Sequence, residues 1–233
     1  MKRLLKAENY GTSNLGWLKS RFHFSFAEYY NPDNLGFGML RVLNDDQVRP
    51  GTGFDTHPHQ DMEIDSYVVE GELTHGDSMG HREVLKRGQV QFMSAGTGIY
   101  HSEHNKGNAT LRFLQMWIFP DKNGYVPNYG DHRFAWEERI NRFLPLASGM
   151  EGEAPVKIHQ DASIYASFLE PGKELSFEVK PGRQVYLVNI EGKLDVSGTE
   201  LSMRDSLEVV EEGMLFKTAE GAHFLFIEMA KQD

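Results

Sequence analysis

The sequence predicts an all-β protein built from two antiparallel units, and three observations support this. Gly and Pro number 23 and 9 among 233 residues, which is typical of a chain with many turns. Short apolar or alternating runs recur at close spacing, separated by glycine, asparagine and aspartate. No long helical period interrupts these runs, and their pattern returns in the second half of the chain.

Four strand-like runs occupy the first half of the chain. They cover residues 38–46, 62–77, 82–96 and 109–120. Apolar runs of this length with turn residues between them are typical of a β-sandwich or barrel.

Three less regular segments follow these runs. Residues 120–133 are rich in turn formers, and residues 133–143 predict a short helix. Residues 146–157 are small and polar with one proline, and therefore predict a linker.

The second half resembles the first and indicates an internal duplication. Each half places an apolar strand before a Glu–Gly pair, at Glu70–Gly71 and at Glu191–Gly192. When these pairs are aligned, Glu178 falls opposite His57 and Lys180 falls opposite His59. The second copy therefore lacks the histidine pair of the first.

Two further segments repeat in the same order, which completes the case for duplication. Residues 205–213 parallel residues 88–96, and residues 222–229 parallel residues 111–118. We expect an N-terminal metal-binding domain at 1–142 and a degenerate C-terminal domain without metal at 143–233.

Composition narrows the class of protein. Because the chain has no cysteine, disulfides, thiolate metal sites and a cysteine nucleophile are excluded, and a reducing compartment is favoured. The formal net charge of −10 disfavours direct nucleic-acid binding. No run approaches the roughly 20 apolar residues of a membrane span, and the N-terminus lacks a secretory signal. We therefore expect a cytoplasmic protein that does not bind membranes.

Two short motifs carry most of the predicted chemistry. His57 and His59 are two residues apart, and so are His101 and Glu103. Because residues two apart on a strand share one face, each pair presents two ligand atoms on the same side. Two such strands facing each other could surround one cation with three imidazoles and a carboxylate. These donors suit Fe(II), Mn, Co, Ni, Cu or Zn.

The carboxylate ligand has a rival in Glu63. If the strand ran straight from His57, residues 57, 59, 61 and 63 would share a face, and spacing alone does not choose between Glu63 and Glu103. The remaining histidines lack a partner pattern and are interpreted as structural or surface residues. They are His23, His75, His81, His104, His132, His159 and His223.

Several segments resemble the pirin family of the cupin superfamily. The resemblance is carried by residues 23–46, by the stretches GFDTHPHQDMEI, YVVEGELTHGDSMG and FMSAGTGIYHSEHN, and by LQMWIFP. It covers most of the first 120 residues and continues weakly through the second half.

The resemblance implies a bicupin fold with two antiparallel, jelly-roll-like β-barrels. It implies a metal site in the first barrel, formed by His57, His59, His101 and Glu103, with Glu63 as a hydrogen-bonding neighbour. It also implies a quercetin 2,3-dioxygenase-type activity, in which a metal ion, most often iron, and O2 open the ring of a flavonol and release carbon monoxide. Glu103 would act as the base. The alternative is a non-catalytic, metal- or redox-sensing regulator that binds a protein partner.

Overall fold

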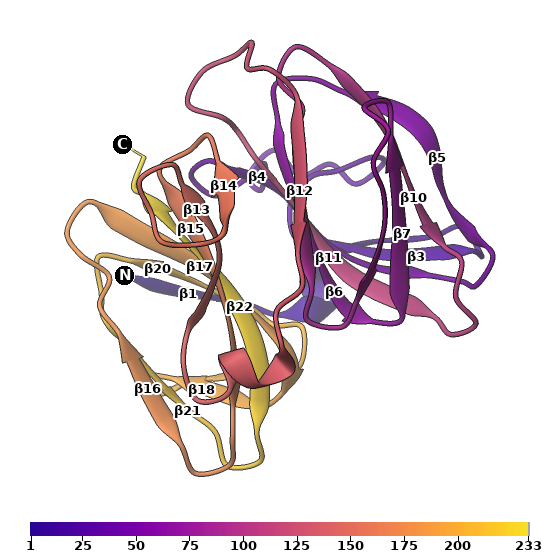
Figure 1. The fold of residues 1–233 in the computed structure, drawn as a ribbon. Coiled ribbons are helices and arrows are strands. Elements are labelled where there is room, and N and C mark those ends of the chain that lie inside the picture. The colour runs from indigo at the N-terminus through magenta and orange to yellow at the C-terminus, as the bar shows by residue number, and fades with distance from the viewer. Residues whose placement is uncertain (233) are drawn as a thin grey trace. The chain divides into compact units, whose positions relative to one another are not determined.

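The computed structural model describes residues 1–232, which form two compact units (Figure 1). The N-terminal unit contains Tyr10–Phe134 and Ile158–Gln160. The C-terminal unit contains Met1–Asn9, Ala135–Lys157 and the chain from Asp161 on. Neither unit is one continuous stretch of the sequence. The division into domains at 1–142 and 143–233 stays a prediction.

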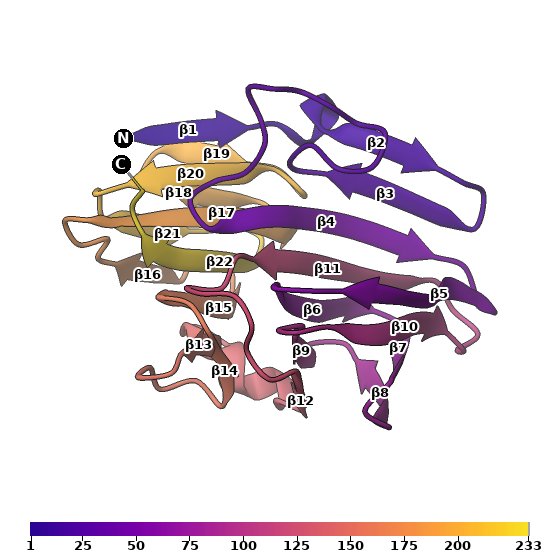
Figure 2. The same cartoon turned by 90° about the horizontal axis from the view of Figure 1, so that it is seen from above.

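The N-terminal unit has a seven-stranded and a four-stranded sheet. The larger sheet has the order β12 (Asn128–His132), β9 (Val90–Ser94), β6 (Glu63–Glu70), β11 (Leu111–Ile118), β4 (Leu40–Val48), β3 (Leu18–Phe22) and β2 (Gly11–Asn14). The smaller sheet has the order β5 (Thr52–His59), β10 (Ile99–Asn105), β7 (Glu72–Asp77) and β8 (Arg82–Lys86). Figure 2 shows the long pair β4 and β11 side by side.

The C-terminal unit repeats this construction. Its larger sheet has the order β1 (Lys2–Leu5), β20 (Ser206–Val210), β17 (Arg183–Gly192), β22 (Ala222–Ala230), β15 (Ala162–Leu169), β13 (Leu144–Gly149) and β14 (Val156–Ile158). Its smaller sheet has the order β16 (Glu174–Phe177), β21 (Met214–Lys217), β18 (Leu194–Val196) and β19 (Thr199–Leu201). Two 3-10 turns, η1 (Ala7–Asn9) and η2 (Trp136–Arg139), complete it.

The matching strand orders confirm the predicted duplication and the all-β, antiparallel fold class. Even the irregularities coincide. The pairing of β6 with β11 skips Val69, and the pairing of β17 with β22 skips Ile190, each directly before a glycine-containing hairpin. Gly71 in the first hairpin has φ 77°, and a Cβ there would lie 2.6 Å from the Thr110 carbonyl oxygen, so the turn requires glycine.

The detailed alignment of the two halves differs by one residue from the prediction. His101 pairs with His57, and its counterpart Met214 pairs with Phe177. Phe177, and not Glu178, therefore occupies the position of His57. The second copy has one more residue between this position and its Glu–Gly pair, and aligning the Glu–Gly pairs concealed that insertion.

Two local predictions also change. The predicted linker at 146–157 is wrong, because most of it lies in β13, in β14 and in the turn between them, with Leu146, Ala154 and Val156 buried. Glycine, serine, proline and glutamate are interspersed among these buried residues, so its composition resembled a loop. The predicted helix at 133–143 is only the short 3-10 turn η2.

Each unit has its own core between its two sheets. In the N-terminal unit, Leu73 and Leu85 of the smaller sheet pack with Val48, Leu111 and Phe113 of the larger one. In the C-terminal unit the corresponding cluster is larger and richer in aromatic residues. Within residues 1–232 no helix has the length and apolar character needed to cross a membrane.

Candidate metal centre

Strands β5 and β10 bring the three predicted imidazoles together. His57 and His59 lie on one face of β5, and the antiparallel register sets His101 directly opposite His57. The two strands approach closely because residue 53 is glycine: a Cβ there would lie 2.4 Å from the Glu103 carbonyl oxygen. The pairing of β5 with β10 shifts its register between His101 and Glu103, next to this contact.

The imidazole nitrogens converge on one point. One nitrogen from each of His57, His59 and His101 lies within 4.8 Å of the others, and this is the only such group among residues 1–232. The Nε2 atoms of His57 and His101 are 3.1 Å apart. His57 Nδ1 is 2.7 Å from the Asp55 carbonyl oxygen, which can only accept, so Nδ1 carries the proton and Nε2 presents its lone pair.

Burial keeps two of these rings in the form that binds metal. Burial and the neighbouring imidazoles of His101 and His57 lower the pKa of His59 to about 3. Burial and the nearby His57 and His75 lower the pKa of His101 to about 3. Both rings are therefore neutral at pH 7, and neutral imidazole is the ligand form. Three convergent imidazoles fit a divalent transition metal.

Glu103 follows His101 by two residues on β10, but its carboxylate is not in the group of ligand atoms that lie within 4.8 Å of one another; it is held by side chains of the opposite sheet. Its Oε1 accepts hydrogen bonds from Ser66 Oγ at 2.9 Å and Gln91 Nε2 at 2.6 Å. Its Oε2 accepts one from Gln115 Nε2 at 2.6 Å. Burial raises the pKa of Glu103, while the hydrogen bonds from Ser66 and Gln115 and the nearby His75 oppose that rise. Its assignment as the fourth ligand stays a prediction.

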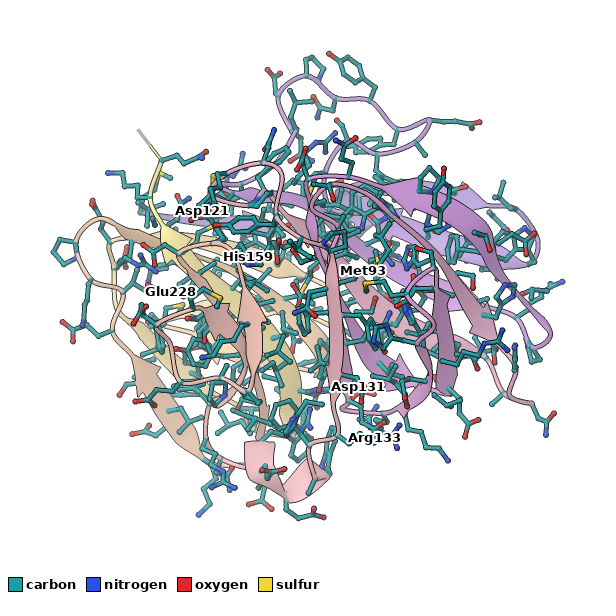
Figure 3. All side chains as sticks on the ribbon, turned by 45° about the horizontal axis from the view of Figure 1, so that its top comes forward. Met93, Asp121, Asp131, Arg133, His159 and Glu228 are labelled. Atoms are coloured by element: carbon teal, nitrogen blue, oxygen red, sulfur yellow. The ribbon has the colours of Figure 1, made fainter. Side chains whose placement is uncertain are left out.

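Glu63 lies on another element, so the straight strand that made it a rival ligand does not occur. β5 ends at His59, Asp61 turns the chain with φ 47°, and Glu63 begins β6 in the larger sheet. There Glu63 Oε1 accepts a hydrogen bond from Ser94 Oγ at 2.7 Å and lies 3.3 Å from His159 Nδ1. Figure 3 shows His159 near Asp121, whose backbone N–H donates to the His159 carbonyl.

His75 is a neighbour of the site that the sequence did not indicate. It is buried on β7, opposite Glu103, and its ring lies 5.7 Å from that of His101. Its Nε2 lies 2.9 Å from Asp77 Oδ2, and its ring stacks on Tyr129 at 4.2 Å. Burial opposes ionisation of Asp77, but hydrogen bonds from His75 and His81 outweigh it and lower the pKa of Asp77.

The other histidines lie outside the triad. His81 bonds Asp77, His104 faces Asp55 at 3.6 Å, and His223 bonds Glu191. His23 is buried and stacks on Tyr10.

Trp117 forms an aromatic wall beside the triad. Its ring meets that of His59 edge-on at 4.9 Å and that of Phe26 at 5.4 Å. Among other apolar residues of the unit, Phe54 packs against Trp17, Met93 joins a cluster with Ile64, Ile99 and Tyr129, and Phe92 is buried.

A cavity of about 630 Å³ lies against the four-stranded sheet. Its lining includes Thr74, Ser102 and His104, and also His75 and the triad residue His101. The triad is accessible from the side of His57 and His59, which are both half-buried.

Comparisons with known proteins agree with this architecture. A family model described as "Pirin" matches residues 5–118, and one described as "Quercetinase C-terminal cupin domain" matches residues 145–229. A protein of Escherichia coli (strain K12) named quercetin 2,3-dioxygenase is 40% identical over 210 residues, covering 90% of both chains. A pirin-like protein of Caulobacter vibrioides is 40% identical over 222 residues, covering 94% of this chain and 96% of its own.

A solved structure shares nearly the whole fold. The bacterial pirin YhhW of Escherichia coli, in complex with nickel(II), has a TM-score of 0.93 and 37% identity, with all of both chains covered.

Proposed function

The chain belongs to the pirin family, and from this premise we propose that it is a metal-dependent dioxygenase acting on a flavonol-like substrate. The observation that carries the proposal is the convergence of three imidazole nitrogens, one from each of His57, His59 and His101, within 4.8 Å. The names of relatives at about 40% identity support the same reaction class.

The proposed ligand set is His57, His59, His101 and Glu103. We propose Fe(II) as the native ion, and the same nitrogen and oxygen donors accept Mn, Co, Ni, Cu or Zn. Nickel(II) in a related bacterial pirin is consistent with a first-row ion at such a site. When bound, the ion supplies Lewis-acid and oxygen-activating chemistry.

The residues of the chain have three tasks in this proposal. Glu103, held in place by its hydrogen bonds, accepts the proton of the substrate's 3-hydroxyl. His57 and His59 lie at the half-buried edge of the site, where a flat aromatic substrate can approach. Trp117 offers this substrate an apolar wall that excludes water from one side.

A direct test is aerobic turnover of quercetin. The purified protein is stripped of metal, reloaded with Fe, Mn, Co, Ni or Cu in turn, and mixed with quercetin in air. The proposal predicts loss of the flavonol's visible absorbance with release of carbon monoxide, and no loss with the His101→Ala variant. Unchanged absorbance with every ion would contradict the proposed substrate class.

The regulatory alternative stays a prediction. It would be favoured by capture of a protein partner by the iron-loaded chain in one oxidation state only, together with the absence of quercetin turnover.

A further inference from the structure

The Glu103 carboxylate is surrounded by hydrogen-bond donors before any cation is considered. Ser66, Gln91 and Gln115, which we call the amide clamp, donate to it at 2.9, 2.6 and 2.6 Å. All three come from the seven-stranded sheet, whereas Glu103 comes from the four-stranded sheet. The side chain of Glu103 is only 2% exposed, so water does not compete with these contacts.

Both glutamine amides are oriented by a second set of donors. Trp117 Nε1 lies 3.2 Å from Gln115 Oε1, and an indole N–H can only donate. Tyr129 Oη donates to Gln91 Oε1 at 3.4 Å. With their oxygens occupied in this way, both glutamines turn their NH2 groups toward Glu103. All three donors of the amide clamp therefore point toward the carboxylate of Glu103.

The two carboxylate oxygens differ in what the clamp leaves free. Each carboxylate oxygen has about two lone-pair sites. Oε1 accepts from both Ser66 and Gln91, so its sites are filled, whereas Oε2 accepts only from Gln115. One site on Oε2 remains, which a cation would occupy or, if the carboxylate left the cation, the proton of the substrate.

The C-terminal unit shows that the fold does not need this network. Strand pairing places Phe216 at the position of Glu103, and Leu187, Leu207 and Phe226 at the positions of Ser66, Gln91 and Gln115. All four replacements belong to one apolar cluster. The carboxylate and its three donors are thus present together in one unit and absent together in the other.

From these contacts we propose that Gln91 and Gln115, with Ser66, are positioning residues that hold Glu103 so that only its Oε2 binds the metal. This inference rests on the proposed metal site. The clamp keeps the carboxylate oriented, so that little ordering is left to metal binding. Loss of outer-shell partners of this kind typically weakens metal binding by about 10–100-fold.

The test compares isosteric variants by metal affinity and spectroscopy. Gln115→Met and Gln91→Met remove the donor but keep the chain length, and Trp117→Phe removes the N–H that orients Gln115 together with part of the ring beside His59. Gln184→Met is the matched control, because Gln184 is a buried glutamine on β17 in the other unit. Co(II) dissociation constants are measured by chelator competition, and the Co(II) visible spectrum reports the ligand set.

We expect Gln115→Met to weaken Co(II) binding by about 10–100-fold and to alter the visible bands. Trp117→Phe should give a smaller change in the same direction, and Gln184→Met should give none. Circular dichroism of the metal-free variants should match wild type. If Glu103→Gln alters the spectrum but both clamp variants bind and absorb like wild type, the clamp inference is wrong and the metal site stands. If the wild type binds no Co(II), the proposed metal site itself fails.

Discussion

Strands β10 and β21 hold the same position in their sheets, yet one presents polar side chains to the interior of its unit and the other presents apolar ones. β10 presents His101 and Glu103 to the interior of its unit, whereas β21 presents Met214 and Phe216. Around β21 the interior is filled by rings such as Phe224, which stacks on Phe216 at 4.9 Å. Around β10 the corresponding space holds glutamines, a serine and imidazoles.

This difference separates the needs of the fold from those of the site. An apolar interior is sufficient to build the duplicated sheets, as the C-terminal unit demonstrates. The polar interior of the N-terminal unit buries groups whose charged forms are costly, including Asp46, whose pKa burial raises to about 7. Such a cost is expected where residues are retained for chemistry and not for stability.

Removal of one imidazole from the N-terminal unit should have the largest effect, which is on metal binding. His101→Ala is expected to abolish stoichiometric metal binding while the fold persists, because His101 bonds another ligand and is not part of either apolar cluster of its unit. Elemental analysis of the purified variant measures this, and circular dichroism checks the fold. Unchanged metal content would show that the site lies elsewhere.

Glu103→Gln should reduce turnover more than metal content. A glutamine would direct an NH2 group at one of the clamp donors and could not accept a proton from the substrate. We expect a fall in kcat of about 10²–10⁴-fold, the usual contribution of a general base. Steady-state turnover of quercetin, normalised to bound metal, is the measurement, and a normalised rate equal to wild type would remove Glu103 from the role of base.

Placing the carboxylate in the other unit should be destabilising. Phe216→Glu would bury an unpaired charge among phenylalanines without any donor of a clamp, at a cost of about 3–5 kcal/mol. Phe216→Leu, which keeps the interior apolar, should cost about 1–3 kcal/mol. Urea denaturation compares the two variants. Equal stabilities of the two variants would contradict the prediction, because they would mean that the apolar interior accepts a buried carboxylate as readily as a leucine.

Asp46→Asn should have an effect on stability that depends on pH. Burial raises the pKa of Asp46 to about 7, so the folded protein retains a proton that the unfolded chain loses above about 4. The stability that wild type gains from Asp46 is therefore present below pH 4 and lost as the pH rises through 7. In denaturation experiments, the free energy of unfolding of the variant should increase relative to that of wild type between pH 4 and pH 8. A stability difference that is independent of pH would contradict the shift.

The sequence predicted the parts of this molecule that depend on periodicity. Alternation and turn residues indicated the antiparallel strands, and the repeated Glu–Gly pair indicated the duplication. The two-residue spacing of His57 and His59 predicted that they share a face, and the structure brings them to His101.

Features that depend on the register between distant strands were not predictable from the sequence. Gln91 and Gln115 carry no local pattern, and only the pairing of β6 with β9 and β11 brings them to Ser66. His75 looked like a residue beside a turn, because its burial follows from contacts with Tyr129 and not from its neighbours in sequence. The β13–β14 segment resembled a linker because glycine, serine, proline and glutamate are interspersed among its buried residues.

The most direct test of the account is an anomalous difference map from crystals of the metal-loaded protein. The account predicts one strong peak bonded to His57, His59, His101 and Glu103 Oε2, and no peak beside Phe177 and Met214 in the C-terminal unit. A peak away from these four side chains, or none at all in crystals whose protein binds the ion in solution, would contradict it.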